Sequence, residues 1–197
     1  GADPKESGQV FIEGKEVHIK SPKDAKKAGL GFITEDRKEE GLILNMDLHT
    51  NVGMAILDQL KKSFGLDLKR ESILMDEYIK SLNIKCRDGN QKAKALSGGN
   101  QQKVVIAKWL ATKPKVLIMD EPTRGIDVGS KNQIYALIND LAKQGIGIIM
   151  ISSELPEVLQ VANNIVVFAA GKVTGRLENK DLTQDILLDY ATSQKAV

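Results

Sequence analysis

The sequence has a single cysteine and shows no imbalance between positive and negative charge. Cys86 has no second cysteine to pair with, so an extracellular scaffold held by internal disulfides is excluded. The formal net charge of +2 gives no strongly basic balance of the kind that indicates a nucleic-acid surface. We therefore expect a cytosolic protein that does not bind nucleic acid.

Long apolar runs are also missing. The longest, such as 146–151, fall far short of the roughly 20 residues that a membrane-spanning helix needs. The first residues, GADPKESGQV, are polar and lack the apolar core of a signal peptide. We expect no direct insertion into a membrane, so any membrane association must go through a partner.

The first forty residues predict a hairpin, a short helix and a strand. Alternating residues in QVFIEGKEV indicate a β-hairpin over 8–17. Ser21 followed by Pro22 is a helix-start signal for the segment KDAKKAG. A short apolar strand over 30–34 then leads into the charged run 35–40, which we predict to be a loop.

The middle of the chain predicts helices. From 47 to 86 the apolar residues recur at helical spacing, and Gly65 interrupts the pattern. No stretch of this region alternates like a strand. We interpret 41–95 as a helical subdomain inserted into a core formed by 1–40 and 96–197.

After Leu96 the pattern changes to helices that alternate with short apolar strands. The expected elements are a helix over 99–111, a strand over 116–119, a helix over 131–143, a strand over 147–151, a helix over 155–161 and a strand over 165–168. This order predicts an α/β fold with a mostly parallel sheet covered on both faces by helices. A short strand and a helix starting near Asp181 or Thr183 are expected in 171–197.

Two acidic residues end the predicted strand VLIM. In an open α/β sheet, ligands bind at the carboxyl ends of the strands. Asp120 is placed to hold Mg²⁺, and Glu121 could polarise an attacking water. A strand that ends in a solvated acidic turn is the alternative, and this motif alone leaves both open.

A serine and two glycines precede the predicted helix over 99–111. Ser97 can cap that helix, while the backbone N–H groups of Gly98 and Gly99 beside its positive end offer a site for an anion. Taken alone, the alternative of a flexible loop with an ordinary cap is preferable. The acid-ending strand and then Gly125-Ile126-Asp127 follow at close spacing, which favours the anion site.

The stretch LSGGNQQKVVIAKWLATKPKVLIMDEPTRGIDVGSK resembles the signature motif, Walker B strand and D-loop of ATP-binding-cassette (ABC) ATPases. The likeness extends over nearly the whole chain and implies a P-loop NTPase-like fold. More narrowly, GFITEDRKEEGL, LSGGNQQKV and ISSELPEVL are similar to the second cassette of the two-cassette ATPase subunits that power bacterial importers of ribose, galactose and xylose.

The resemblance implies a set of site residues and partners. It implies ATP and Mg²⁺ as cofactors, with Glu121 as the catalytic residue and Asp120 at the metal. Such cassettes act in pairs, so the signature here would meet the γ-phosphate of ATP held by another ATP-binding cassette. Membrane permease subunits would hold the protein at the inner face of the cell membrane. The nucleotide-contacting residues implied are Ser97, Gly98, Gly99, Asn100, Gln101, Asp127, Glu35 and Ser153.

Three departures from the family pattern bear on activity. No G-x-x-x-x-G-K-[ST] phosphate loop occurs in the sequence, and the resemblance implies that the chain begins just after it. Glu35 stands where the family usually has a glutamine, and Ser153 stands where it has a histidine. A serine cannot replace a titratable imidazole at the γ-phosphate, so we expect the isolated chain not to hydrolyse ATP.

Other readings remain open. The chain could be a regulatory cassette that uses no nucleotide, or a soluble cassette that acts outside transport. His18 and His49 do not follow the Walker B strand, and we interpret both as structural or surface residues. Trp109 is better explained by core packing than by base stacking, and Cys86 has no partner at metal-ligand spacing.

Overall fold

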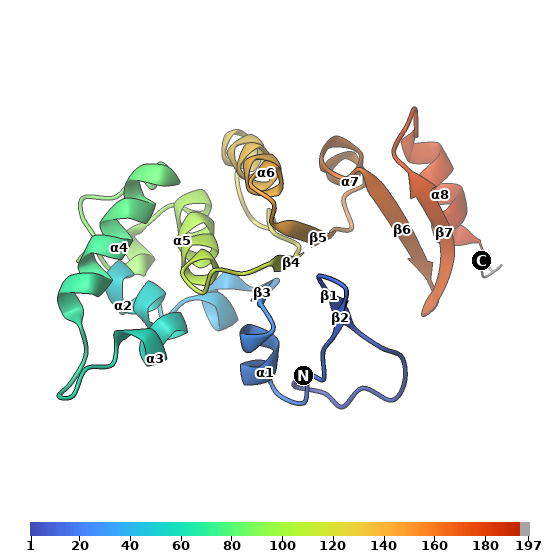
Figure 1. The fold of residues 1–197 in the computed structure, drawn as a ribbon. Coiled ribbons are helices and arrows are strands. Elements are labelled where there is room, and N and C mark those ends of the chain that lie inside the picture. Colours follow the sequence, from blue (N-terminus) through green and yellow to red (C-terminus); the bar gives the residue numbers. More distant parts are fainter. Residues whose placement is uncertain (194–197) are drawn as a thin grey trace. The chain divides into compact units, whose positions relative to one another are not determined.

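The computed structural model describes residues 1–193 and divides the chain into two compact units. The first unit is Gly1–Ile149 and the second begins at Met150. Each is described by itself, with the element labels of Figure 1. The boundaries of the inserted helical subdomain stay a prediction.

The first unit contains a three-stranded sheet. Its strands lie in the order β3 (Leu30–Ile33), β4 (Val116–Asp120) and β5 (Gly147–Ile151), and β5 runs across the boundary between the units. Strands β3 and β4 are parallel, with Phe32 opposite Ile118. The predicted strands 30–34, 116–119 and 147–151 are therefore confirmed.

The two faces of this sheet differ. On one face Ile33, Leu117 and Met119 are fully buried. On the other face Phe32 remains 43% exposed, and in β5 Ile149 remains 52% exposed. The expectation that helices cover both faces of the sheet is therefore not met at Phe32 and Ile149.

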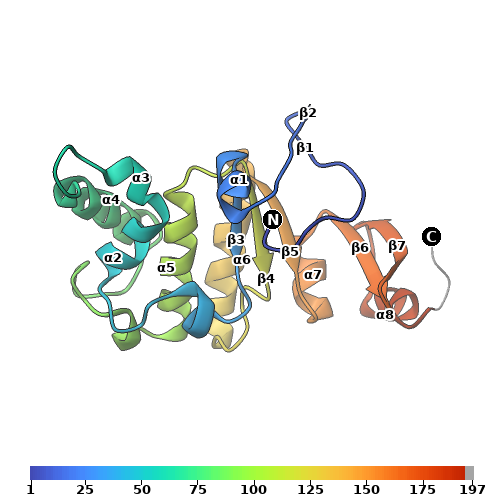
Figure 2. The ribbon, with the colours of Figure 1, turned by 90° about the horizontal axis from the view of Figure 1, so that it is seen from below.

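Helix α5 (Gly98–Leu110) is largely buried and lies between the sheet and a group of helices (Figures 1 and 2). It contacts β3, α2 (Leu48–Gly53) and α6 (Val128–Lys143), and the run 104–107 is fully buried. A Cβ at Gly31 would lie 2.7 Å from a methyl carbon of Leu117 and 3.5 Å from Cβ of Trp109. The small residue in β3 thus permits the close approach of α5, in agreement with a packing role for Trp109.

The helical segment is confirmed in type but not in extent. The helices end at Ser81, and Asn83 adopts a positive φ of 48°, so the prediction of helix as far as Cys86 is wrong. The interruption at Gly65 is confirmed, since this residue has a φ of 73° in the turn before the last helix. The elements are α2 (Leu48–Gly53), η2 (Met54–Ile56), α3 (Leu57–Leu60), α4 (Leu68–Ser81) and the short η3 (Ala93–Ala95).

The hairpin and the first helix are confirmed. Strands β1 (Phe11–Ile12) and β2 (Lys15–Glu16) pair antiparallel, and Ser21 caps α1 (Pro22–Lys27). The loop predicted for 35–40 is wrong. Instead, η1 (Arg37–Gly41) forms one π-helical turn, because the carboxylate of its N-cap Asp36 accepts hydrogen bonds from the next amides.

The second unit holds an antiparallel strand pair between two helices. Strands β6 (Asn164–Ala169) and β7 (Lys172–Glu178) pair with each other, so the expectation that 165–168 joins a parallel sheet is wrong. Helix α8 (Gln184–Thr192) packs against both strands, as expected for a helix starting near Thr183, and α7 (Leu155–Val161) contacts α8. The rest of the predicted segment 171–197, beyond 193, lies outside the described residues.

Candidate functional site

The start of α5 lies at the surface of the first unit. Ser97 is exposed, Gly98 is half-buried and Gly99 is buried. No acidic side chain stands in the first turn of the helix. The first N–H groups of a helix have no partner inside the helix and carry its positive end, so this turn favours an anion.

The predicted cap by Ser97 is wrong. The Ser97 hydroxyl makes no capping hydrogen bond to the helix amides. Instead, its oxygen accepts a hydrogen bond of 2.8 Å from Nδ2 of Asn100. The hydroxyl proton of Ser97 is therefore not directed to Asn100 and can be donated to a ligand.

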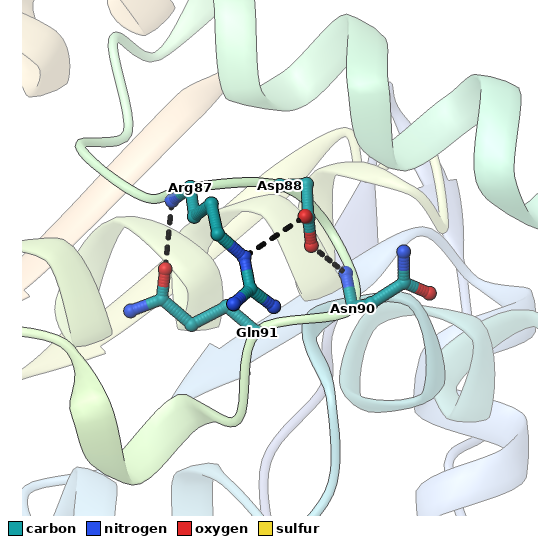
Figure 3. Close-up of polar contacts among 4 residues, drawn as sticks. All are labelled: Arg87, Asp88, Asn90 and Gln91. Carbon is teal, nitrogen blue, oxygen red and sulfur yellow. Dashed lines mark hydrogen bonds and ion pairs between the residues drawn. The ribbon is translucent and has the colours of Figure 1, made fainter.

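Asn100 joins the segment LSGGNQQK (96–103), called the signature segment below, to the loop that precedes it. Its Oδ1 accepts a hydrogen bond of 2.8 Å from the backbone N of Lys85. The same loop carries the contacts in Figure 3, where Asp88 accepts from Arg87 Nε and from the Asn90 amide, and Gln91 accepts from the Arg87 amide. These bonds connect neighbouring residues of the loop, beginning two residues after the amide that meets Asn100.

Gln101 points inward. Its side chain is only 5% exposed, and its Nε2 donates a hydrogen bond of 3.1 Å to the carbonyl oxygen of Ala93. Its Oε1 has no hydrogen-bond partner among the described residues. A direct role of Gln101 at a nucleotide stays a prediction, and its observed contacts are those of a residue that anchors the first turn of α5.

The carboxyl end of β4 carries the two predicted acids. Asp120 and Glu121 are both partly buried, and Glu121 adopts a φ of 44°, a left-handed conformation that is rare for a residue with a side chain. The chain then turns tightly, with the Arg124 amide donating to the carbonyl of Glu121 and the Ile126 amide donating to that of Thr123. This turn leads from the acids to helix α6.

The acids alone do not make a complete metal site. Within residues 1–193, no group of three histidine, cysteine, aspartate or glutamate side chains could hold a metal ion. Mg²⁺ is commonly bound by only one or two carboxylates together with water and substrate phosphates. Asp120 therefore fits Mg²⁺ only as one ligand beside a bound nucleotide.

Asp127 caps helix α6, whose residue Ser130 lies beside Gly99 at the start of α5. Its Oδ1 accepts a hydrogen bond of 2.9 Å from the Ser130 amide. Hydrogen bonds from the side chain and the backbone of Ser130 hold the pKa of Asp127 below its usual value. The carboxylate is thus fixed in its charged form at the end of the turn.

Gly99 is required for packing at this point. A Cβ on Gly99 would lie 2.6 Å from both Cβ and Oγ of Ser130 in α6. We expect Gly99→Ala to lower the free energy of unfolding by about 1–3 kcal/mol, the usual cost of overpacking. Ser130→Gly removes both obstructing atoms, so urea titrations of the double variant should show less destabilisation than the sum of the two single changes. Additive losses would contradict this assignment.

Glu35 and Arg37 connect the charged run to the turn after β4. The Glu35 carboxylate pairs with the guanidinium of Arg124, both being about half-exposed. Arg37 is only 8% exposed; its Nη1 donates to the carbonyl of Arg124 at 2.6 Å, and its Nη2 donates to that of Gly125 at 3.0 Å. Burial lowers the pKa of Arg37, which nevertheless stays charged because its usual pKa is so high.

A basic pocket of about 360 Å³ opens beside the start of α5. Its lining includes Arg37, Lys38, Lys94 and Gly98. The Nε of Arg37 is buried without a hydrogen-bond partner in the described part of the chain. Sequence reasoning missed Arg37, since a charged run gives no signal that one of its members folds inward.

Ser153 lies in the second unit. It is exposed at the bend between β5 and α7, where the neighbouring Ser152 hydroxyl donates to Glu157 at 3.0 Å and accepts from the Glu154 amide. The bend is thereby held by Ser152 and leaves the Ser153 backbone at the surface. A contact of Ser153 with nucleotide stays a prediction.

Comparison with known proteins gives consistent matches. A family model described as ABC transporter matches residues 1–124. The ribose import ATP-binding protein RbsA of Geobacillus kaustophilus is 50% identical over 192 residues, which are 98% of this chain and 39% of that protein. RbsA of Bacillus subtilis is 47% identical over the same shares. The chain thus spans about two fifths of the length of these curated relatives.

Solved structures agree on the fold. A dimeric ATP-binding cassette in a post-hydrolysis state bound to ADP and Pi matches with a TM-score of 0.73 and 22% identity, over 91% of this chain and 77% of that one. An ATP-binding cassette of an ABC transporter matches with a TM-score of 0.75 and 22% identity, over 95% and 78%. At this identity the likeness establishes the α/β cassette fold alone.

Proposed function

The chain belongs to the ABC transporter family, and from this we propose that it is part of the ATP-binding subunit of a monosaccharide importer. In this proposal the start of α5 completes the binding site of an ATP molecule held by a partner cassette. The observation that carries the proposal is the exposed Ser97 at a helix start without a side-chain cap or an acidic residue. The ribose-import names of the relatives support the importer class.

The contact with the nucleotide would be made by backbone amides and one hydroxyl. The N–H groups at the start of α5 would bind the γ-phosphate, as helix N-termini bind anions generally. The Ser97 hydroxyl, which accepts from Asn100, would donate to the same phosphate. Asp127 would lie in the turn that faces the same partner.

The second potential site of this chain would be degenerate. Asp120 and Glu121 would face a nucleotide site that lacks the phosphate loop in this sequence. Mg²⁺ bound there with a nucleotide would neutralise phosphate charge, and Asp120 would be its protein ligand. Glu35 is engaged with Arg124, and Ser153 cannot supply an imidazole proton. The proposal therefore assigns this chain a supporting role in ATP hydrolysis and no hydrolysis by itself.

The importer class also implies membrane partners for this chain. Among residues 1–193, the structure contains no helix that is long and apolar enough to cross a membrane. We infer that permease subunits bind the importer subunit at the inner face of the membrane, with the helical segment α2–α4 at the contact. The binding protein and the permease would select the sugar.

Cysteine labelling tests the contact with ATP across the cassette interface. We expect Ser97→Cys, in a Cys86→Ser background, to be protected from maleimide by a non-hydrolysable Mg-ATP analogue in the assembled importer. At an analogue concentration about ten times its Kd, labelling should slow about tenfold, because roughly a tenth of the sites stay empty. The isolated chain should show no protection.

Lys172→Cys provides the matched control, since Lys172 is exposed on β7, outside the signature segment and outside the helices α2–α4 assigned to the permease contact. Its labelling rate should not respond to the analogue. Protection of Ser97→Cys in the isolated chain would contradict the role of a partner cassette. Absence of protection in the assembled importer would favour a regulatory cassette that uses no nucleotide.

A further inference from the structure

We propose that Arg37 is a positioning residue, which holds the turn between Glu121 and Asp127 against the start of α5. The inference deepens the proposed function, on which it rests for its catalytic consequence. The contacts of Arg37 lie within this chain and do not depend on a partner cassette or a nucleotide. Arg37 needs no contact with the nucleotide in this role.

The first observation is the pair of hydrogen bonds from the guanidinium. Nη1 donates to the carbonyl of Arg124 at 2.6 Å and Nη2 donates to the carbonyl of Gly125 at 3.0 Å. The planar guanidinium reaches two successive carbonyl groups, which a lysine ammonium cannot do with the same fixed geometry. Arg37 thus binds the middle of the turn at two adjacent points.

The turn also contains two residues with a positive φ. The amides of Arg124 and Ile126 close it locally, while Glu121 and Gly125 both adopt positive φ angles, 44° and 63°. Glycine adopts a positive φ readily, whereas a residue with a side chain, here Glu121, keeps one only where surrounding contacts hold it. The hydrogen bonds from Arg37 are accepted by Arg124 and by Gly125 itself, at the later of these two residues.

The second observation is the contact of the same guanidinium with the signature segment. A Cβ at Gly98 would lie 2.7 Å from Nη2 of Arg37 and 3.3 Å from the carbonyl oxygen of Gly125. The absence of a side chain at Gly98 therefore lets the guanidinium touch both segments. Arg37, Gly98 and Gly125 form a junction between η1, α5 and the turn.

A third observation links the same elements independently. Glu35, two residues before Arg37, pairs with the side chain of Arg124. This pair is about half-exposed and contributes little to stability. The buried hydrogen bonds of Arg37 are therefore the contacts that hold the turn in place. The Glu35 pair is a second, weaker contact between the same two segments.

Hydrogen exchange on the isolated chain tests the junction without any nucleotide. In Arg37→Met, amides in 121–128 should exchange at least about tenfold faster, the effect of losing one charge-assisted hydrogen bond. Amides in α4 should exchange at the wild-type rate. Arg37→Lys keeps the charge and can reach one carbonyl. Its exchange rates in 121–128 should therefore lie between those of Arg37→Met and those of the wild type. Unchanged exchange in 121–128, or a uniform increase over all elements, would overturn the proposal.

ATPase kinetics of the assembled importer test the consequence. In Arg37→Met, kcat should fall while KM for ATP stays within about twofold of the wild-type value, as expected for a group that orients the site without binding substrate. Arg37→Lys should restore part of kcat. A rise in KM at constant kcat would contradict the positioning role. If the analogue does not protect Ser97→Cys, the proposed function is rejected. The hydrogen-exchange result tests the role of Arg37 alone, because it is measured on the isolated chain without nucleotide.

Discussion

In the assembled importer, the Ser97→Asp variant should lose about a hundredfold or more of ATPase activity, whereas Ser97→Asn should retain most of it. The aspartate would remove a hydrogen bond to the γ-phosphate and place a carboxylate beside it. A loss of about 3 kcal/mol from these two effects corresponds to about a hundredfold in rate. Steady-state phosphate release measures this difference.

The two variants are matched to exclude unfolding as the cause. Aspartate and asparagine have nearly the same size, and both are favourable N-cap residues. A negative charge at the first turn of α5 also stabilises the helix, which carries no acidic residue there. Thermal unfolding should therefore show Ser97→Asp to be at least as stable as wild type. Equal activity of the two variants would rule out the phosphate contact.

The elements with strong local patterns could be predicted from the sequence. Strand β5 and helix α7 have the expected bounds, because an apolar run and a Pro-containing helix start are signals carried by neighbouring residues. Helix α6 begins three residues earlier than expected, at Val128. Its N-cap is Asp127, for which the resemblance implies a nucleotide contact that stays a prediction.

The pairing of distant strands could not be predicted in the same way. An apolar strand has the same local pattern whether it joins a parallel sheet or pairs antiparallel with its successor, as β6 does with β7. The sequence also gives no sign that Phe32 and Ile149 stay exposed, since burial depends on which elements cover the sheet. Long-range contacts decide both features.

The site shows the same division between local and distant information. The glycines of the signature segment predicted the start of α5, but Ser97 bonds to Asn100 instead of capping the helix. The reason for Gly99 lies in Ser130, and the reason for Gly98 lies in Arg37, both distant in sequence. A motif therefore indicated a candidate site, while the contacts that shape this segment became visible only in the fold.

Titration of this chain with Mg-ATP should show no saturable binding below millimolar concentration. The sequence has no phosphate loop, and such a loop makes several charge-assisted hydrogen bonds of roughly 1.5–3 kcal/mol each. A deficit on the order of 5 kcal/mol lowers affinity by roughly three to four decades, from micromolar to millimolar or weaker. Isothermal titration calorimetry measures this directly.

The residues that remain in the chain cannot replace these bonds. The start of α5 offers the amides of a single helix turn, whereas a phosphate loop surrounds the phosphates. Asp120 repels phosphate unless Mg²⁺ lies between them. A cassette that carries the G-x-x-x-x-G-K-[ST] loop serves as the positive control under the same conditions. Asp120→Asn should leave the isotherm of this chain flat, because no bound nucleotide depends on that carboxylate. A micromolar isotherm that Asp120→Asn weakens would mean that the chain holds nucleotide at its own acids, and the assignment of a supporting role would be wrong.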